Sequence, residues 1–254
     1  MAGRQGSFVS RAINGCAAAL TAALLFATGA PTQAATVTIN STALNAIYSQ
    51  TSFGSNPISI SVLPTTTINN SSLLSINTNS ALNTLFGLGT DSYTDHIVDM
   101  FFVDSIGYCG GPGSNIIGCG QQPGNKLVVD SGYAAGAQGS ILEGHELGHN
   151  LGLGHVAGPD SNLMNPALDS GSVTTLTVSQ VNAILAQANA MSGLTSGSPL
   201  LHDSSGYSFS IRPYLIVATT PLPATLPLFA GGLSVMALIV RRRRRHAASM
   251  HAAA

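Results

Sequence analysis

Residues 145–155 read HELGHNLGLGH, and this stretch decides both the fold and the chemistry that we expect. His145 and His149 are four residues apart, so a helix would carry both imidazole rings on one face. Gly152 permits a sharp turn after the helix, which would bring His155 round as a third ligand. Three neutral imidazoles leave the fourth position of a tetrahedral Zn²⁺ open for water, as in catalytic rather than structural zinc sites.

The pattern H-E-x-x-H-x-x-G-x-x-H resembles that of the metzincin zinc peptidases, in which a methionine turn follows downstream. Met164 lies nine residues after His155, in the segment SNLMNP. The resemblance implies that Met164 lies beneath the metal and supports the histidine ligands. It also implies an α+β fold with a mixed, twisted β-sheet, a zinc-binding active-site helix and a C-terminal helix. Pro166 stands where some metzincins carry a tyrosine, so no tyrosine ligand is expected.

Glu146 directly follows the first ligand and is expected to be the general base rather than a ligand. Zn²⁺ would lower the pKa of a bound water towards about 7 and polarise the substrate carbonyl. Glu146 would take the proton from that water and pass it to the leaving amine. The sequence therefore predicts a secreted zinc-dependent endopeptidase. The alternatives are a non-catalytic envelope or matrix protein that uses the zinc fold as a scaffold, and a hydrolase of a non-protein amide such as peptidoglycan.

The N-terminus, residues 1–34, has the pattern of a secretory signal peptide. Two arginines precede an apolar run at 16–26, and Thr-Gln-Ala at 32–34 offers a cleavage site between small residues. The apolar run is too short to span a membrane. We therefore predict export of the remaining chain.

The catalytic domain is expected at 35–218, a size that can bury its own core. We divide it into an upper subdomain at about 35–152 and a lower one at about 153–218. It holds all ten acidic residues of the chain but only two basic ones, Lys126 and Arg212, so its net charge is −8. This balance excludes the basic surface of a nucleic-acid-binding protein, and the high apolar content excludes disorder.

The C-terminus, residues 219–246, has three parts. Pro-Leu-Pro at 221–223 precedes an apolar transmembrane segment at 224–240 and five arginines at 241–245, and 247–254 forms a tail. This order resembles the PEP-CTERM sorting signal of Gram-negative bacteria, with leucine in place of the usual glutamate. The resemblance implies recognition by an exosortase-type enzyme in the inner membrane and release to the cell envelope or extracellular matrix. A plain membrane anchor is the alternative.

Cys109 and Cys119 form an even pair in an oxidising compartment, which predicts a disulfide around the loop at 110–118. The bridge would contribute roughly 3 kcal/mol by restricting the unfolded chain. A zinc site at this pair is the competing interpretation, but no nearby histidine would complete it. No cysteine lies between Ala35 and Cys109, so latency through a cysteine switch is not expected. Whether 35–56 is a removable propeptide stays open.

Apolar patterns predict the secondary structure around the motif. Strands are expected at 36–40, 57–63, 96–103, 126–130 and 207–217. Helices are expected at 42–50, over part of 72–86, at about 138–151 and from 177 to about 191, with a polar linker at 192–206. The nearly continuous apolar run at 96–103 indicates a central strand.

Polar residues at the helix starts fit two capping boxes, Ser140 with Glu143 and Thr177 with Gln180. The glycines of the zinc helix at 144 and 148 predict close packing against the sheet. The disulfide loop and residues around 126–133 are the candidates for an edge strand that binds substrate backbone by β-augmentation.

The remaining candidate ligands form no recognisable motif. Four aspartates could hold Ca²⁺, although their spacing matches no known loop and solvated or capping roles are favoured: Asp91, Asp95, Asp99 and Asp104. His96 and His202 are isolated, and we expect structural or surface roles for them.

Overall fold

The structure is a computed structural model that describes residues 37–157, 161–167, 173–189 and 198–218. The signal peptide predicted at 1–34, the sorting signal at 219–246 with its apolar segment at 224–240, and the tail at 247–254 lie outside these residues. Within the described ranges, no helix has the length and apolar character needed to cross a membrane.

The described chain has a mixed α+β fold with five α-helices and two β-sheets. The helices are α1 (Ser41–Tyr48), α2 (Asn79–Phe86), α3 (Ser131–Ala134), α4 (Gly139–Asn150) and α5 (Val178–Asn189). The strands are β1 (Ile58–Val62), β2 (Thr66–Asn69), β3 (Ser75–Ile76), β4 (Ile97–Val103), β5 (Ser105–Tyr108), β6 (Pro112–Ile116), β7 (Gly118–Gly120), β8 (Lys126–Asp130), β9 (Leu201–Asp203) and β10 (Gly206–Val217). Short 3-10 helices lie at Thr51–Phe53, Ser71–Leu73 and Tyr93–Asp95.

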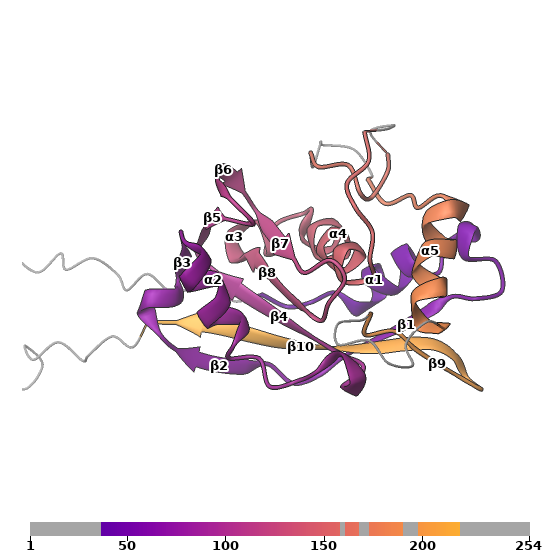
Figure 1. Cartoon of the computed structure of the whole chain (residues 1–254), viewed down its shortest axis with the longest axis horizontal. Helices are drawn as coiled ribbons and strands as arrows, with labels where there is room; N and C mark the ends of the chain where they lie inside the picture. The colour runs from indigo at the N-terminus through magenta and orange to yellow at the C-terminus, as the bar shows by residue number, and fades with distance from the viewer. Residues whose placement is uncertain (1–36, 158–160, 168–172, 190–197, 219–254) are drawn as a thin grey trace, which may run out of the picture. The chain divides into compact units, whose positions relative to one another are not determined.

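The main sheet has the strand order β1-β10-β4-β8-β7, and β2 and β9 also pair with β10 (Figure 1). Its pairs are parallel except β7 with β8 and β9 with β10. The mixed sheet of the sequence prediction is therefore present. A second, small sheet has the order β3-β5-β6.

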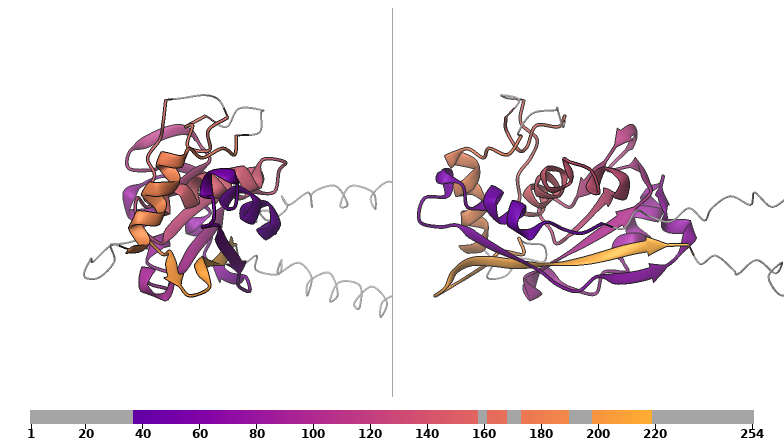
Figure 2. Two further views of the ribbon diagram at one scale, coloured as in Figure 1. Left: turned by 90° about the vertical axis from the view of Figure 1, so that its right-hand side faces the viewer. Right: turned by 180° about the vertical axis from the view of Figure 1, so that it is seen from behind.

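Strand β4 is central and buried on both faces, as its continuous apolar sequence predicts. Val98, Met100 and Phe102 point into a core that α1, α4 and α5 complete. Phe101 and Val103 point to the opposite face, into a second core with α2. Figures 1 and 2 show α1, α4 and α5 on one side of the long strand β10.

Helix α1 packs directly against α4. Tyr48 is fully buried, and its hydroxyl donates a hydrogen bond to the carbonyl oxygen of Gly144 at 2.7 Å. A Cβ on Gly144 would lie 3.1 Å from Cδ1 of Ile47, and a Cβ on Gly148 would lie 2.5 Å from Sδ of Met164. The two helix glycines thus pack closely against α1 and the methionine segment, and the prediction that they pack against the sheet was wrong.

The described residues 37–40 of the strand predicted at 36–40 form no strand, and Asn40 is the N-cap of α1 instead. The Oδ1 atom of Asn40 accepts a hydrogen bond from the N–H of Ala43 at 3.0 Å and caps α1. Val37 and Ile39 pack against the core without pairing to a strand. Their alternation therefore reflects half-burial rather than strand pairing.

Side-chain caps mark where α2 and α5 begin. In the region predicted as 72–86, Thr78 accepts from Ala81 N–H at 3.1 Å, so α2 starts only at Asn79. The box of Thr177 with Gln180 is confirmed, with reciprocal hydrogen bonds of 2.9 and 3.2 Å. At 192–206, the described residues include β9, whereas 190–197 lie outside the described part.

The capping box of Ser140 with Glu143 was wrong. Helix α4 begins at Gly139, so Ser140 lies inside its first turn and Gln138 occupies the N-cap position. Glu143 is only 1% exposed. Its carboxyl group is therefore a buried side chain of the helix rather than part of a solvent-facing cap.

The last strand, β10, lies between β1 and β4. Ile211 pairs with Val62 on one side and with Val98 on the other. The predicted lower subdomain at 153–218 therefore contributes a central strand to the sheet of the predicted upper subdomain at 35–152. The alternation at 207–217 predicted the strand, but a local pattern does not indicate which neighbours a strand selects.

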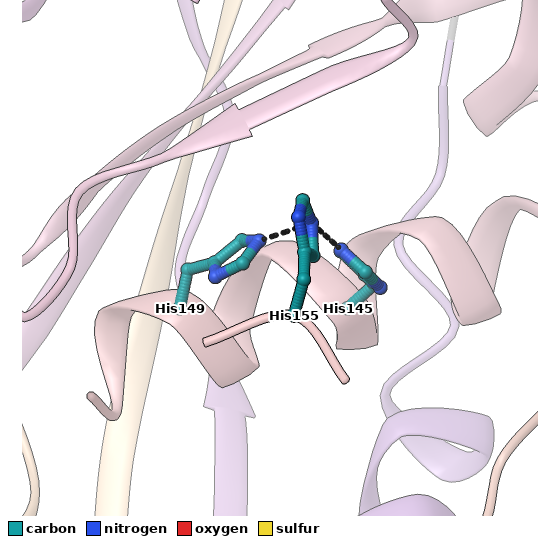
Figure 3. A group of neighbouring side chains, drawn as sticks. All are labelled: His145, His149 and His155. Atoms are coloured by element: carbon teal, nitrogen blue, oxygen red, sulfur yellow. Dashed lines mark hydrogen bonds between the residues drawn. The ribbon is translucent and has the colours of Figure 1, made fainter. Parts of the chain in front are cut away.

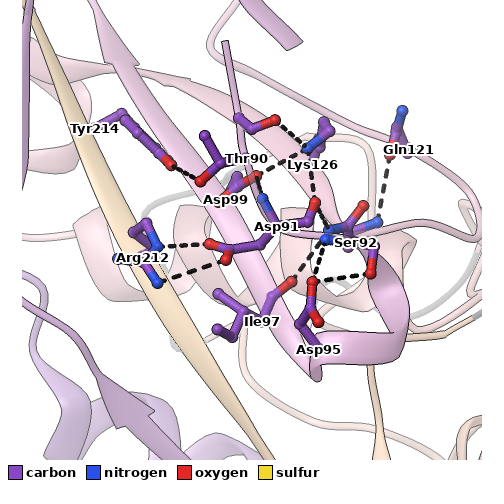
Figure 4. Close-up of polar contacts among 12 residues, drawn as sticks. Thr90, Asp91, Ser92, Asp95, Ile97, Asp99, Gln121, Lys126, Arg212 and Tyr214 are labelled. Carbon is purple, nitrogen blue, oxygen red and sulfur yellow. Dashed lines mark hydrogen bonds and ion pairs between the residues drawn. The ribbon is translucent and has the colours of Figure 1, made fainter. Parts of the chain in front are cut away.

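The face of the sheet opposite α4 carries a cluster of ion pairs (Figure 4). Nζ of Lys126 lies 2.8 Å from the fully buried Asp99, and Arg212 pairs with Asp91. Asp95 accepts from Ser92 N–H at 2.7 Å. Three of the four aspartates considered for Ca²⁺ are thus bonded to other groups of the protein.

Replacing Tyr48 with phenylalanine removes the hydrogen bond to Gly144 and keeps the aromatic ring. We expect the free energy of unfolding to fall by about 1–2 kcal/mol, because a buried carbonyl loses a donor. Denaturant titration measures the change. Tyr133→Phe is the matched control: Tyr133 is 55% exposed, and we expect an effect below about 0.5 kcal/mol. Equal effects in the two variants would contradict the role of Tyr48.

Candidate metal centre

Helix α4 carries two of the three predicted ligands, His145 and His149, with ring centroids 4.9 Å apart. The helix ends in a Schellman motif. Gly152 N–H donates to the carbonyl of His149 at 2.8 Å, and Leu153 N–H donates to the carbonyl of Gly148 at 2.9 Å. The φ angle of Gly152 is +89°, which side chains disfavour, so the predicted need for glycine at this turn is confirmed.

The turn returns His155 to the other two rings. Its Nε2 atom lies 3.1 Å from Nε2 of His145 and 3.1 Å from Nε2 of His149 (Figure 3). A tetrahedral Zn²⁺ with bonds of about 2.0–2.1 Å separates its nitrogen ligands by about 3.3 Å. The three rings therefore have a spacing that one metal ion can fill. Within the described ranges, this is the one cluster of three such side chains.

Backbone carbonyls orient the two helical rings. Nδ1 of His145 donates to the carbonyl of Leu163 at 2.6 Å, and Nδ1 of His149 donates to that of Leu153 at 2.8 Å. Because a carbonyl only accepts, each Nδ1 carries the proton and each Nε2 presents a lone pair. Burial lowers the pKa of His145 to about 4 and also lowers the pKa of His149, which favours neutral rings. The lone pairs of the two helical rings thus face Nε2 of His155, in the orientation that a shared metal ion requires.

Met164 is fully buried against α4 at Gly148. Its carbonyl accepts a hydrogen bond from Val156 N–H at 3.0 Å, next to His155 in the chain. The preceding residue, Leu163, supplies the carbonyl that orients His145. The methionine segment therefore supports one ligand on the helix and one after it.

Glu146 faces the edge strand β7. It is 4% exposed, and its Oε2 atom has no hydrogen-bond partner among the described residues. A Cβ on Gly118 would overlap Oε1, and a Cβ on Gly120 would lie 3.3 Å from Oε2. Burial raises the pKa of Glu146 to about 8, opposed by a hydrogen bond from the Gly120 backbone. The two glycines, which the sequence analysis missed, leave the space for this carboxylate.

A cleft in two parts surrounds the histidines. Cavities of about 200 and 280 Å³ share Cys109, Gly118, Glu146 and His155 in their walls. The smaller also has Gln122, and the larger has an apolar wall: Ile116, Ile117, Leu142 and Pro166. His155 is exposed, so the ligand cluster is open to solvent.

The rim of the cleft agrees in part with the sequence prediction. The disulfide between Cys109 and Cys119 is present, and its loop leads into β7 at the sheet edge. Residues 126–130 form β8, which lies between β4 and β7, so they are not an edge strand. The sequence missed β7 because Gly-Cys-Gly has no apolar pattern; the alternating glycines were the available signal.

The isolated histidines lie outside the cluster, as expected. A ring nitrogen of His96 lies 3.2 Å from the carbonyl of Pro199, and His202 stacks on Tyr207 with ring centroids 4.1 Å apart.

Comparisons of the chain with protein-family models, curated proteins and solved structures find no match.

Zn²⁺ is expected to stabilise the metal-free protein, because it binds the folded ligand cluster. At a free concentration of 100 times Kd, the gain is about 2.7 kcal/mol. His149→Ala should lose most of this gain, whereas the control His202→Ala should keep it. Thermal unfolding with and without Zn²⁺ measures the shift, and metal analysis counts the bound ion. A full shift in both variants would exclude this site.

The buried Glu143 generates a pH-dependent prediction for the metal-free protein. Burial raises its pKa from 4.5 to about 8, so the folded state holds the proton more tightly than the unfolded state. Stability therefore falls as the pH rises from about 4.5 to about 8. Glu143→Gln should lose this part of the slope and exceed wild type in stability at pH 8, as urea titrations measure.

Asp203→Asn is the control for the Glu143 experiment. Hydrogen bonds from Ser205 lower the pKa of Asp203, so its ionised form stabilises the fold above the unfolded pKa. Removal of that charge should lower stability at neutral pH, opposite in sign to Glu143→Gln. If the stability of Glu143→Gln fell more steeply with rising pH than that of wild type, the prediction for Glu143 would be contradicted.

Proposed function

We propose that the protein is a zinc-dependent endopeptidase of metzincin type. The observation that carries the proposal is the convergence of three imidazole Nε2 atoms beside a buried glutamate with an unpartnered oxygen. The donor set fits Zn²⁺, because imidazole suits this ion and three protein ligands leave a position for water. His145, His149 and His155 would hold the ion. When bound, it supplies Lewis acidity that activates water and polarises a peptide carbonyl.

The proton transfers belong to Glu146. Its side chain lines the same cavities as His155, and the free Oε2 is available to accept the proton of the attacking water. The same carboxyl would then donate the proton to the leaving amine. Gly118 and Gly120 keep this carboxyl in a space from which bulk water is largely excluded, which strengthens its electrostatic interactions.

A polypeptide is the substrate that the cleft supports best. Strand β7 is at the sheet edge beside the ligand helix, so an extended peptide can pair with the backbone groups that β8 and Glu146 do not use. The larger cavity, with Ile117, Leu142 and Pro166, can take an apolar side chain of that peptide.

Export is part of the same proposal. The signal peptide at 1–34 would direct the chain across the inner membrane of a Gram-negative bacterium. An exosortase-type enzyme would act on the tail at 219–246, with release to the cell envelope or matrix. The disulfide between Cys109 and Cys119 supports an oxidising compartment.

Glu146→Gln tests the proposal in the full-length protein. The substitution removes the base and keeps the three ligands, so kcat on casein or peptides should fall by about 10²–10⁴-fold. Bound zinc, counted by metal analysis, should not change. Glu143→Gln is the matched control: it neutralises another buried carboxyl of α4 and should keep activity within a few-fold.

Two experimental outcomes would contradict the peptidase proposal and favour another function. A wild-type protein that binds zinc and is folded, yet cleaves nothing in a broad peptide library, would be a non-catalytic envelope or matrix protein. Release of muropeptides without proteolysis would instead identify a peptidoglycan hydrolase.

A further inference from the structure

Gln122 is a polar side chain at the cleft to which the proposed chemistry assigns no role. It lines the smaller cavity together with Glu146, His149 and His155. Its Nε2 atom lies 3.1 Å from the position that a Cβ on Gly154 would take, so the amide reaches across the turn before His155. The side chain is exposed and makes no hydrogen bond within the described part of the chain. Its donor and its acceptor are therefore both available to a ligand.

Asn150 fixes the loop that carries Gln122. This side chain is fully buried, and its Nδ2 donates to the carbonyls of Gln121 and Lys126, each at 3.0 Å. The backbone carbonyl of Asn150 accepts from Gly124 N–H at 3.2 Å. These bonds tie the loop between β7 and β8 to the last residue of the ligand helix. The Gln122 backbone is thus held in place before a substrate binds, which reduces the entropic cost of recognition.

Among the described residues, the cleft has no lysine, arginine or second carboxylate that could pair with a charged substrate side chain. Apart from Glu146, none of the residues found in its walls is a carboxylate, lysine or arginine. The described lysine and arginine, Lys126 and Arg212, are engaged in ion pairs on the other face of the sheet (Figure 4). A charged side chain would lose hydration here without gaining an opposite charge. The cleft therefore favours uncharged substrate residues.

The two cavities differ in the kind of side chain that they favour. The smaller presents the free carboxamide of Gln122, which can donate and accept at once. The larger has the apolar wall described above beside the polar side chains of Asn115, His145 and Asn165. A site with an unpaired polar group discriminates strongly against ligands that leave it unpaired, whereas an apolar pocket discriminates more weakly.

We infer that Gln122 is a specificity-determining residue, an inference that rests on the proposed peptidase function. The substrate is a polypeptide with an uncharged hydrogen-bonding side chain, such as asparagine, glutamine, serine or threonine, in the smaller cavity. An apolar side chain on the other side of the scissile bond occupies the larger cavity.

The test is the cleavage profile of a randomised peptide library with the full-length protein. Wild type should select uncharged polar residues at one subsite and apolar residues at the opposite one. Gln122→Met, of similar length but without the amide, should lose the polar selection by about tenfold and keep the apolar one. Gln122→Glu should change the preference at the polar subsite to lysine and arginine, because the carboxylate supplies an ion-pair partner.

A binding measurement separates recognition from catalysis. In the Glu146→Gln background, fluorescence anisotropy gives the affinity for a selected peptide and for its counterpart with alanine at the polar position. Gln122→Met should weaken binding of the polar peptide only. A merely structural role would weaken both peptides equally, and that result would overturn the inference.

Val178→Glu is the charge control, because it adds the same charge at a 60% exposed position of α5 outside both cavities. Its profile should match wild type. Hydrolysis with identical profiles for wild type, Gln122→Met and Gln122→Glu would overturn the inference and leave the peptidase proposal intact. Absence of hydrolysis in wild type would overturn both.

Discussion

The candidate centre depends on two hydrogen bonds from imidazole Nδ1 atoms to backbone carbonyls, those of His145 to Leu163 and His149 to Leu153. They assign the tautomers of these two rings and direct both Nε2 lone pairs toward Nε2 of His155. Each carbonyl belongs to a segment outside the helix that its ring occupies. The ligand geometry is therefore set by the way the chain folds back after α4, and not by the helix alone.

The elements packed around α4 allow the chain to fold back against this helix. Close contact of α1 and the methionine segment with α4 is possible because the helix has glycine at 144 and 148. On the other side, glycines of β7 leave space for Glu146. Large side chains are therefore absent at the positions where neighbouring elements approach the helix, and a buried carboxylate oxygen of Glu146 is left without a hydrogen-bond partner among the described residues. This combination separates the centre from an ordinary buried helix.

Short-range patterns were enough to predict much of this arrangement. The ligand spacing, the turn at Gly152, the disulfide and the central strand β4 each follow from residues close in sequence, and the structure agrees with them. Three features needed tertiary information. A side-chain cap at Asn40 replaced a strand, Glu143 was buried although its spacing fitted a cap, and β7, which reads Gly-Cys-Gly, has no apolar alternation to mark it. The placement of β10 between β1 and β4 depends on contacts more than a hundred residues apart, which no local pattern records.

The position of β10 between β1 and β4 determines when the main sheet can form during synthesis of the chain. The ligand motif is synthesised well before β10, yet the sheet that supports it has a gap between β1 and β4 until residues 206–217 are available. A shortened nascent chain would expose two unpaired strand edges and lack a continuous support for the centre. Because loop closure over such a separation comes late in folding, the complete domain must emerge before the sheet can close. A protein built in this way gains its rigid framework only once the whole domain exists.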